Sequence, residues 1–315
     1  MSPIRDRGDR PAAEGDAPRV ARRGRAPMTT GRQVDPVTPR HRGVLAGRSA
    51  LITVMINAVM KTARGLRRDF GEVEKLQVSE KGPGDFVSLA DKRAEQTLLD
   101  ELMRVRPGFG FLGEEGNKVL GDGHHRFIVD PLDGTTNFLH GIPHFAISVA
   151  LEKDGEVVAG VIYEPIGDEL YWAEKGKGAF LDTVATKSHR LRVSGRRQLG
   201  NALIGTGIPF RGRGDHPAYL AQLEAVMGQT AGVRRQGSAA LDLAFVAAGR
   251  LDGFWESGLS AWDIAAGVLM VKEAGGFLSE IGGKPHRLDS PSILAANGHL
   301  GGPLTRLLRG AAKAG

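Results

Sequence analysis

Apolar residues recur at helical spacing in two segments of the first half of the chain. One stripe predicts an amphipathic helix over residues 48–70, and it consists of Ile52, Met55, Val59 and Leu66. The segment SLADKRAEQTLLDELMRV, residues 88–105, predicts a second amphipathic helix with Ser88 as its N-cap. Between them, KGPGD at residues 81–85 is polar and glycine-rich, which predicts a loop.

Short apolar runs bounded by turn residues predict strands in the middle of the chain. FIVD, residues 127–130, is one such run. FAISVALE and EVVAGVIYEP are joined by Asp154 and Gly155, which predicts a β-hairpin. ELYWAEKG, residues 169–176, predicts a third strand beside them.

Helices and strands mix in the second half without a strict strand–helix alternation. Strands are predicted at residues 202–207, 252–256 and 292–298. A helix is predicted at residues 237–249, capped by Ser238, and a further helix begins at Asp263. A short helix is predicted after the last strand. Since no linker or internal repeat divides the segment, we predict one layered α/β domain over residues 45–315.

The first 44 residues differ in composition from the rest of the chain. They are rich in Arg, Pro and Gly, as in RVARRGRAP, and they contribute to a formal net charge of +6. Such a segment has too few apolar side chains to offset the entropy of ordering it. We therefore predict a disordered basic tail over residues 1–44. A translation start at Met28 or Met55 and RNA binding by the tail are open alternatives.

Cysteine is absent from the chain, which excludes disulfides, a thiolate nucleophile and cysteine-ligated metals. The apolar run at residues 51–60 is too short to span a bilayer, and no secretory signal is present. These features lead us to expect a soluble, cytoplasmic protein.

Acidic residues gather where predicted elements end or begin. DPLDGTTNF, residues 130–138, follows a predicted strand, GEEG lies in a glycine-flanked loop, and DFVSLAD and WD lie at two helix starts. Most have an ordinary explanation. Asp263 can be an N-cap, Asp91 a first-turn acid, Glu114 a loop acid and Asp133 a turn residue.

Asp130 is harder to explain structurally, because it ends an apolar run and a buried carboxylate needs a partner. No Lys or Arg lies within residues 130–138. If several carboxylates converge, their repulsion requires a cation, and Mg²⁺ prefers oxygen ligands. Gly134 and Thr135 can bring backbone N–H groups close to an anion. The pattern therefore predicts metal-assisted phosphoryl transfer from a phosphate ester to water.

Taken together, DPLDGTTNF, GEE, DFVSLAD and ESGLSAWDIAAG resemble the inositol monophosphatase family over residues 48–311. The resemblance implies a layered αβαβα sandwich, of the type shared with fructose-1,6-bisphosphatase. It also implies hydrolysis by a water that two metals activate, two or possibly three Mg²⁺ ions, lithium sensitivity and a homodimer.

The resemblance assigns a role to each motif residue. The metal ligands would be Glu114, Asp130, the Leu132 carbonyl, Asp133 and Asp263, with Asp130 bridging the two ions. The catalytic residues would be Asp91 and Thr135, which direct the attacking water, together with Glu114. The backbone amides of Gly134 and Thr135 would hold the phosphate. Lys81 and Asp85 match a mobile loop that closes over the metals in the family.

The substrate is less well specified by these motifs. Glu256 matches a position that contacts the hydroxyls of inositol, and Gly237, Ser238 and Ala239 match the helix start that lines the same pocket. These residues favour inositol 1-phosphate. Related enzymes cleave fructose 1,6-bisphosphate, histidinol phosphate or 3′-phosphoadenosine 5′-phosphate, and a protein that binds RNA or the transcription machinery is an alternative of another class.

Overall fold

The computed structural model describes residues 47–72, 78–82, 85–209, 212 and 214–314, and these belong to one unit, Ala46–Gly315. Of residues 78–82, 85–87 and 312–314 only the backbone is described. The tail predicted over residues 1–44 lies outside these ranges. Within them, no helix is both long and apolar enough to cross a membrane.

The larger sheet has eight strands within the described residues, in the order β10-β9-β8-β7-β6-β5-β3-β4. Its strands are β3 (Gly110–Gly113), β4 (Lys118–Val119), β5 (His125–Asp133), β6 (Ala146–Lys153), β7 (Glu156–Glu164), β8 (Glu169–Glu174), β9 (Gly178–Asp182) and β10 (His189–Arg190). Among these strands β3 and β5 pair in parallel, and the other neighbours are antiparallel. The predicted hairpin is confirmed as β6–β7, and Asp154 and Gly155 both have the positive φ that such a two-residue turn requires.

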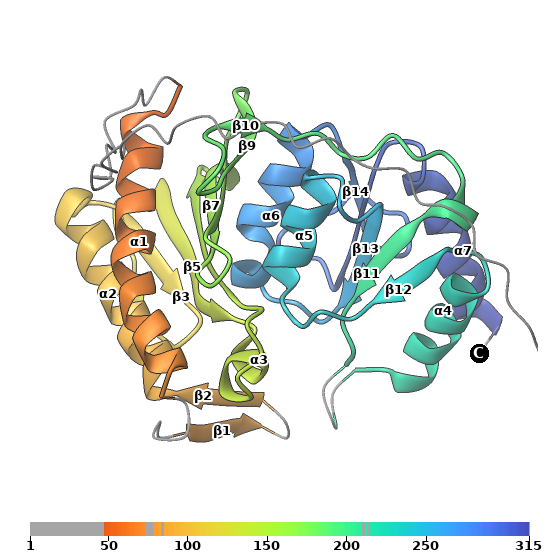
Figure 1. Cartoon of the computed structure of the whole chain (residues 1–315), viewed down its shortest axis with the longest axis horizontal. Helices are drawn as coiled ribbons and strands as arrows, with labels where there is room; N and C mark the ends of the chain where they lie inside the picture. Colours follow the sequence, from red (N-terminus) through yellow and green to blue (C-terminus); the bar gives the residue numbers. More distant parts are fainter. Residues whose placement is uncertain (1–46, 73–77, 83–84, 210–211, 213, 315) are drawn as a thin grey trace, which may run out of the picture. The chain divides into compact units, whose positions relative to one another are not determined.

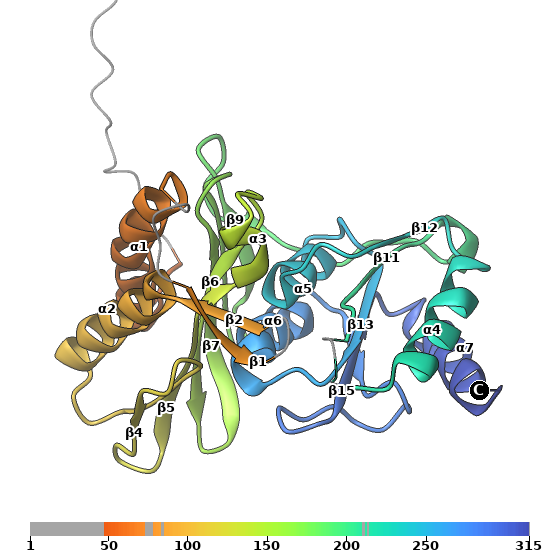
Figure 2. The same cartoon turned by 90° about the horizontal axis from the view of Figure 1, so that it is seen from below.

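Helices α1 (Ala50–Phe70) and α2 (Leu89–Val105) cover one face of this sheet (Figures 1 and 2). Their apolar stripes pack on the sheet in a core that includes Ile52, Met55, Leu98 and Phe127, all fully buried. Both helices begin where the sequence predicts. Ser49 caps α1 by accepting from the Ile52 amide, and Ser88 caps α2.

The opposite face of the sheet packs on α5 (Ala239–Ala247) and α6 (Ala261–Glu273), which are apolar on nearly all sides. A helix that is apolar all round is buried, and these two lie between both sheets (Figure 1). The second sheet has the order β12-β11-β13-β15-β14 in the described residues. Its strands are β11 (Leu203–Thr206), β12 (Gly232–Arg234), β13 (Gly253–Ser257), β14 (Phe277–Ser279) and β15 (Ser292–Ala296).

Helices α4 (His216–Met227) and α7 (Gly301–Ala314) cover the outer face of the second sheet (Figure 2). The layers therefore run helix, sheet, helix, sheet, helix. This confirms the αβαβα sandwich that the sequence resemblance implies.

Three predictions at the level of single elements need correction. Residues 81, 82 and 85 of the predicted loop belong to two paired antiparallel strands, β1 (Val78–Gly82) and β2 (Asp85–Ser88), and residues 83–84 lie outside the described residues. Asp263 is not the N-cap of α6: Ser260 is, and Asp263 lies three residues into the capping box. The strand predicted at 127–130 continues to Asp133 as β5.

Candidate active site

A cavity of about 350 Å³ lies where the end of β5 meets the starts of α5 and α6 and the ends of β11 and β13. Its walls contain most of the site residues predicted from the sequence. The predicted residues that line it are Glu114, Asp130, Leu132, Asp133, Gly134, Thr135, Gly237, Ser238, Ala239, Glu256 and Asp263. Asp91 does not line the cavity and lies behind Thr135. Lys81 and Asp85 are in β1 and β2, and their side chains are outside the described part.

Asp130 lies at the centre of the acidic cluster and is fully buried. Its Oδ1 accepts the Leu132 amide at 2.9 Å, which ties the carboxylate to its own turn. Burial raises the pKa of Asp130 well above its ordinary value, and the charges of Glu114, Asp133 and Asp263 raise it further. The cluster thus resists ionisation unless positive charge is brought to it.

Asp133 ends β5 and faces the start of α5. Its Oδ2 accepts from the Ser238 hydroxyl at 2.6 Å and from the Ala240 amide at 2.7 Å. These donors lower the pKa, but burial outweighs them and raises the pKa of Asp133 to about 6. The helix start therefore holds the carboxylate in place without neutralising it.

Asp91 and Asp263 are held in the same way, each by the N-terminus of its own helix. Asp91 Oδ2 accepts from the Ser88 amide at 2.8 Å and from the Ser88 hydroxyl at 2.6 Å. Asp263 Oδ2 accepts from the Ser260 amide at 2.6 Å. In a capping box, the acid at the third position bonds the backbone of the cap residue. The structural role predicted for these acids and a role at the site are therefore compatible.

Thr135 connects Asp91 to the cavity. Its hydroxyl lies 3.1 Å from Asp91 Oδ1 and 3.0 Å from the Leu132 carbonyl oxygen. A hydroxyl has one proton, so it donates to one of these acceptors at a time. Burial raises the pKa of Asp91, although the hydrogen bonds from Ser88 and Thr135 oppose that shift.

Gly134 caps the short helix α3 (Thr135–Leu139) with a φ of 97°, in the left-handed region. A Cβ at this position would lie 3.1 Å from the His144 carbonyl oxygen and 3.2 Å from the Gly237 carbonyl oxygen. Glycine is therefore required here for both conformation and space. The close approach brings the α3 start and the α5 start together at the cavity.

The carboxylates surround the cavity but do not form a closed cage. No group of three or more His, Asp or Glu side chains in the described residues is already close enough together to enclose a metal. The donor set nevertheless fits hard divalent cations, because four carboxylates and a backbone carbonyl line one cavity, and the charges of the other three acids raise the pKa of Asp130. Among the described lining residues Arg235 is the one basic side chain, and it is a neighbour of Glu256 rather than of Asp130.

Glu256 of β13 and Asp242 of α5 also line the cavity. Burial raises the pKa of Glu256 well above its ordinary value, and the charge of Asp242 adds to this while Arg235 opposes it. Burial also raises the pKa of Asp242 to about 8, against a hydrogen bond of 2.8 Å from Gln236 Nε2. This wall is rich in oxygen acceptors and bears one guanidinium.

Several residues of the site were missed from the sequence. Glu95 of α2 is fully buried and accepts the amides of Glu115 and Asn117 at 2.7 and 2.9 Å, which fixes the GEEG loop. Asp242 and Arg235 line the cavity. The amphipathic pattern of residues 88–105 places Glu95 near the core. Because a buried acid needs hydrogen-bond partners, this position was the available signal.

Comparison with known proteins agrees with this geometry. The family model described as "Inositol monophosphatase family" matches residues 48–313. The chain belongs to the inositol monophosphatase family. The family is one of phosphatases that act on small-molecule phosphate esters and are generally metal-dependent, so this chain is an enzyme of that class.

Similar proteins carry two kinds of name within the family. Inositol-1-monophosphatase of Rhizobium meliloti is 58% identical over 265 residues, 83% of this chain and 97% of that protein. Nus factor SuhB of Pseudomonas aeruginosa is 43% identical over 252 residues, 77% of this chain and 91% of its own length. The crystal structure of extragenic suppressor protein suhB from Bartonella henselae superposes with a TM-score of 0.79 at 54% identity, covering 83% of this chain and 99% of that one.

Proposed function

We propose that this enzyme hydrolyses inositol 1-phosphate to inositol and phosphate in a Mg²⁺-dependent reaction. The observation that supports this most is the convergence of four carboxylates in one cavity that Glu256 also lines. The carboxylate side suits metal-bound phosphate, and the Glu256 side suits hydroxyl groups. A relative at 58% identity bears the name inositol-1-monophosphatase.

For the metals, we propose ligands drawn from five residues. The first Mg²⁺ would be held by Glu114, Asp130 and the Leu132 carbonyl, and the second by Asp130, Asp133 and Asp263. When bound, such ions activate a water and neutralise charge on the phosphate and on the leaving oxygen. Lys81 and Asp85 would belong to the mobile loop that the family resemblance implies, and we assign no ligands to a third ion.

The protein's own groups would position the water and the phosphate. Asp91 and Thr135 form a hydrogen-bonded pair that ends at the cavity wall, so the Thr135 hydroxyl can orient a water and pass its proton toward Asp91. Glu114 lies in the same wall and can accept from that water. The Gly134 and Thr135 amides would hold the phosphate oxygens, which the left-handed turn at Gly134 leaves room for.

The choice among phosphate esters rests on the polar groups near Glu256 in the cavity. A second phosphate, as in fructose 1,6-bisphosphate or 3′-phosphoadenosine 5′-phosphate, would need cationic partners, and Arg235 is the one basic side chain among the described lining residues. Hydroxyl groups need no cation and can bond to both Glu256 and Asp242. We propose that Glu256, with the α5 start at Gly237, Ser238 and Ala239, recognises the inositol hydroxyls.

A substrate panel tests this proposal. Phosphate release would be measured at saturating Mg²⁺ from inositol 1-phosphate, fructose 1,6-bisphosphate, histidinol phosphate and 3′-phosphoadenosine 5′-phosphate. The proposal expects the highest kcat/KM for inositol 1-phosphate. A preference of about a hundredfold or more for another ester, roughly 3 kcal/mol in transition-state binding, contradicts it.

A role in transcription is a second candidate, because a relative at 43% identity is named a Nus factor and residues 1–44 are basic. Deleting residues 1–44 and measuring RNA affinity against salt concentration tests it. A phosphate-driven interaction weakens steeply as salt rises. Unchanged RNA affinity after the deletion counts against a role of the tail.

Three further properties are proposed from the family resemblance: a homodimer, lithium inhibition and a cytoplasmic location. Light scattering tests the first, and inhibition of phosphate release by LiCl but not by NaCl tests the second. Fractionation of cells with an antibody to the chain tests the third. A monomer, an equal response to both salts, or recovery outside the cytoplasm would contradict the respective proposal.

A further inference from the structure

Gly207 follows β11 directly and lines the cavity beside Glu256 of β13. A Cβ built at Gly207 would overlap the Glu256 carboxylate, since its three nearest neighbours are Oε1, Cδ and Oε2, all nearer than 3.0 Å. Real Cβ atoms do not approach other atoms so closely. The Glu256 carboxylate therefore occupies the volume that any side chain at position 207 would need.

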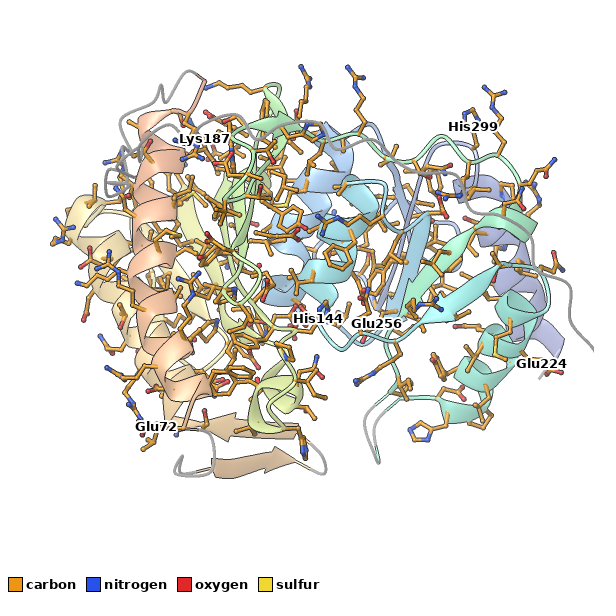
Figure 3. All side chains as sticks on the ribbon, viewed as in Figure 1. Glu72, His144, Lys187, Glu224, Glu256 and His299 are labelled. Atoms are coloured by element: carbon orange, nitrogen blue, oxygen red, sulfur yellow. The ribbon has the colours of Figure 1, made fainter. Side chains whose placement is uncertain are left out.

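Little else holds the Glu256 carboxylate in this place. Within the part of the chain that the structure describes, it accepts no hydrogen bond, and its interactions are the charges of Asp242, Asp263, Asp133 and Arg235. The Glu256 side chain, labelled in Figure 3, is partly exposed and lines the cavity. An acid with acceptors that no protein donor uses is available to hydroxyl groups of a ligand.

A side chain at position 207 would displace the carboxylate without disturbing the backbone. The overlap involves only the far end of a flexible side chain. Gly207 is not among the residues of positive φ, so an L-residue can adopt its conformation. The parallel pairing of Thr206 with Trp255 next to it does not depend on either side chain.

We infer that Gly207 is a specificity-determining position. Because glycine has no side chain, the Glu256 carboxyl group can occupy the place where it contacts the leaving alcohol. The inference rests on the proposed function, because it deepens the role given to Glu256. According to this inference, position 207 affects recognition of the alcohol but not the reaction at the phosphorus atom. The acids of β5 and α6 lie on other elements, and the three atoms nearest to a Cβ at position 207 all belong to Glu256.

The variant Gly207→Ala tests this directly with two substrates. Inositol 1-phosphate presents ring hydroxyls to Glu256, whereas 4-nitrophenyl phosphate presents none. Losing hydrogen bonds to the Glu256 carboxyl group is expected to lower kcat/KM for inositol 1-phosphate by roughly 10- to 100-fold, mainly through KM. Turnover of 4-nitrophenyl phosphate should change by less than about threefold, since no contact to that alcohol is lost.

Two further variants decide whether Gly207 acts through Glu256. Glu256→Ala should reproduce the loss, and Gly207→Ala combined with Glu256→Ala should be no worse than Glu256→Ala alone. Gly200→Ala is the matched control, because a Cβ at Gly200 meets nothing within 4 Å. It should leave both substrates and the thermal unfolding midpoint unchanged.

The outcomes separate the inference from the function on which it rests. If the unaltered enzyme prefers inositol 1-phosphate and Gly207→Ala keeps that preference, the inference is overturned alone. Equal losses on both substrates, or additive losses in the double variant, overturn it as well. An unaltered enzyme that does not prefer inositol 1-phosphate overturns the proposed function itself.

Discussion

The substitution Asp133→Asn removes one charge from the acidic cluster while keeping the shape of the side chain. The amide oxygen of the introduced asparagine can still accept from the Ser238 hydroxyl and the Ala240 amide, the two donors that hold Asp133 now. The fold should therefore persist. The proposed second metal site loses a ligand, so turnover should be abolished.

The metal-free variant should also be more stable than the unaltered protein. Burial raises the pKa of Asp133 from 3.8 to about 6. The folded state thus binds the proton more tightly than the unfolded state does. The contribution of protonated Asp133 to the free energy of unfolding is fully present below about pH 4 and is lost as the pH rises through about 6. A difference of about two in pKa corresponds to about 3 kcal/mol, an upper bound on the gain from the substitution at neutral pH.

Urea unfolding of chelator-treated protein at neutral pH and near pH 4 measures this. The free energy of unfolding of Asp133→Asn should exceed that of the unaltered protein at neutral pH, and the two should approach each other near pH 4. Adding Mg²⁺ should stabilise the unaltered protein by about 3 kcal/mol at roughly a hundredfold excess over its dissociation constant, and the variant by less.

Asp100→Asn is the matched control, because Asp100 is exposed on α2, far from the cluster in the fold. It should leave both the pH dependence and the turnover unchanged. The reasoning is refuted if metal-free Asp133→Asn is less stable than the unaltered protein, or if it turns over substrate at the normal rate.

Other predictions concern the groups that support the cluster. Thr135→Val should lower kcat by roughly a hundredfold or more with little change in KM, because it removes the hydroxyl that is bonded to Asp91. Thr135→Ser keeps a hydroxyl and should restore most of the kcat. Steady-state kinetics measure this, and equal rates for the two variants would contradict the role of the hydroxyl. Glu95→Ala leaves the amides of Glu115 and Asn117 without an acceptor, so it should destabilise the protein by about 2–4 kcal/mol and weaken Mg²⁺ binding, as unfolding and metal titration would show. Gly134→Ala should cost about 1–3 kcal/mol by thermal unfolding, since φ is 97° there, and a neutral result would argue against the required left-handed turn.

The acids at element ends were predictable because a strand or helix boundary is a local feature of the sequence. Asp130 and Asp133 follow an apolar run, and Asp263 lies in the first turn of a helix, so their places in the chain indicate a functional site. The layers followed from the resemblance of the motifs. What a local pattern cannot supply is which of these ends meet in space.

Contacts between distant segments were missed for that reason. Thr135 bonds Asp91 across 44 residues, and Ser238 bonds Asp133 across 105. Gly207 and Glu256 meet only because β11 and β13 are neighbours in one sheet. The sequence shows a glycine at the end of a predicted strand, and its usual explanation is a turn. Only the fold shows that the space beside it is filled by a carboxylate.

The most direct test of the account is the initial rate of phosphate release from inositol 1-phosphate as Mg²⁺ is returned to the chelator-treated full-length protein. The account predicts no turnover without metal and a recovery that depends on more than one ion, since the carboxylates that line the cavity are proposed to hold two. Asp133→Asn should show no recovery over the same range. An undiminished rate after chelation, or full recovery in Asp133→Asn, would contradict the claim that the acidic cluster is a metal-dependent catalytic centre.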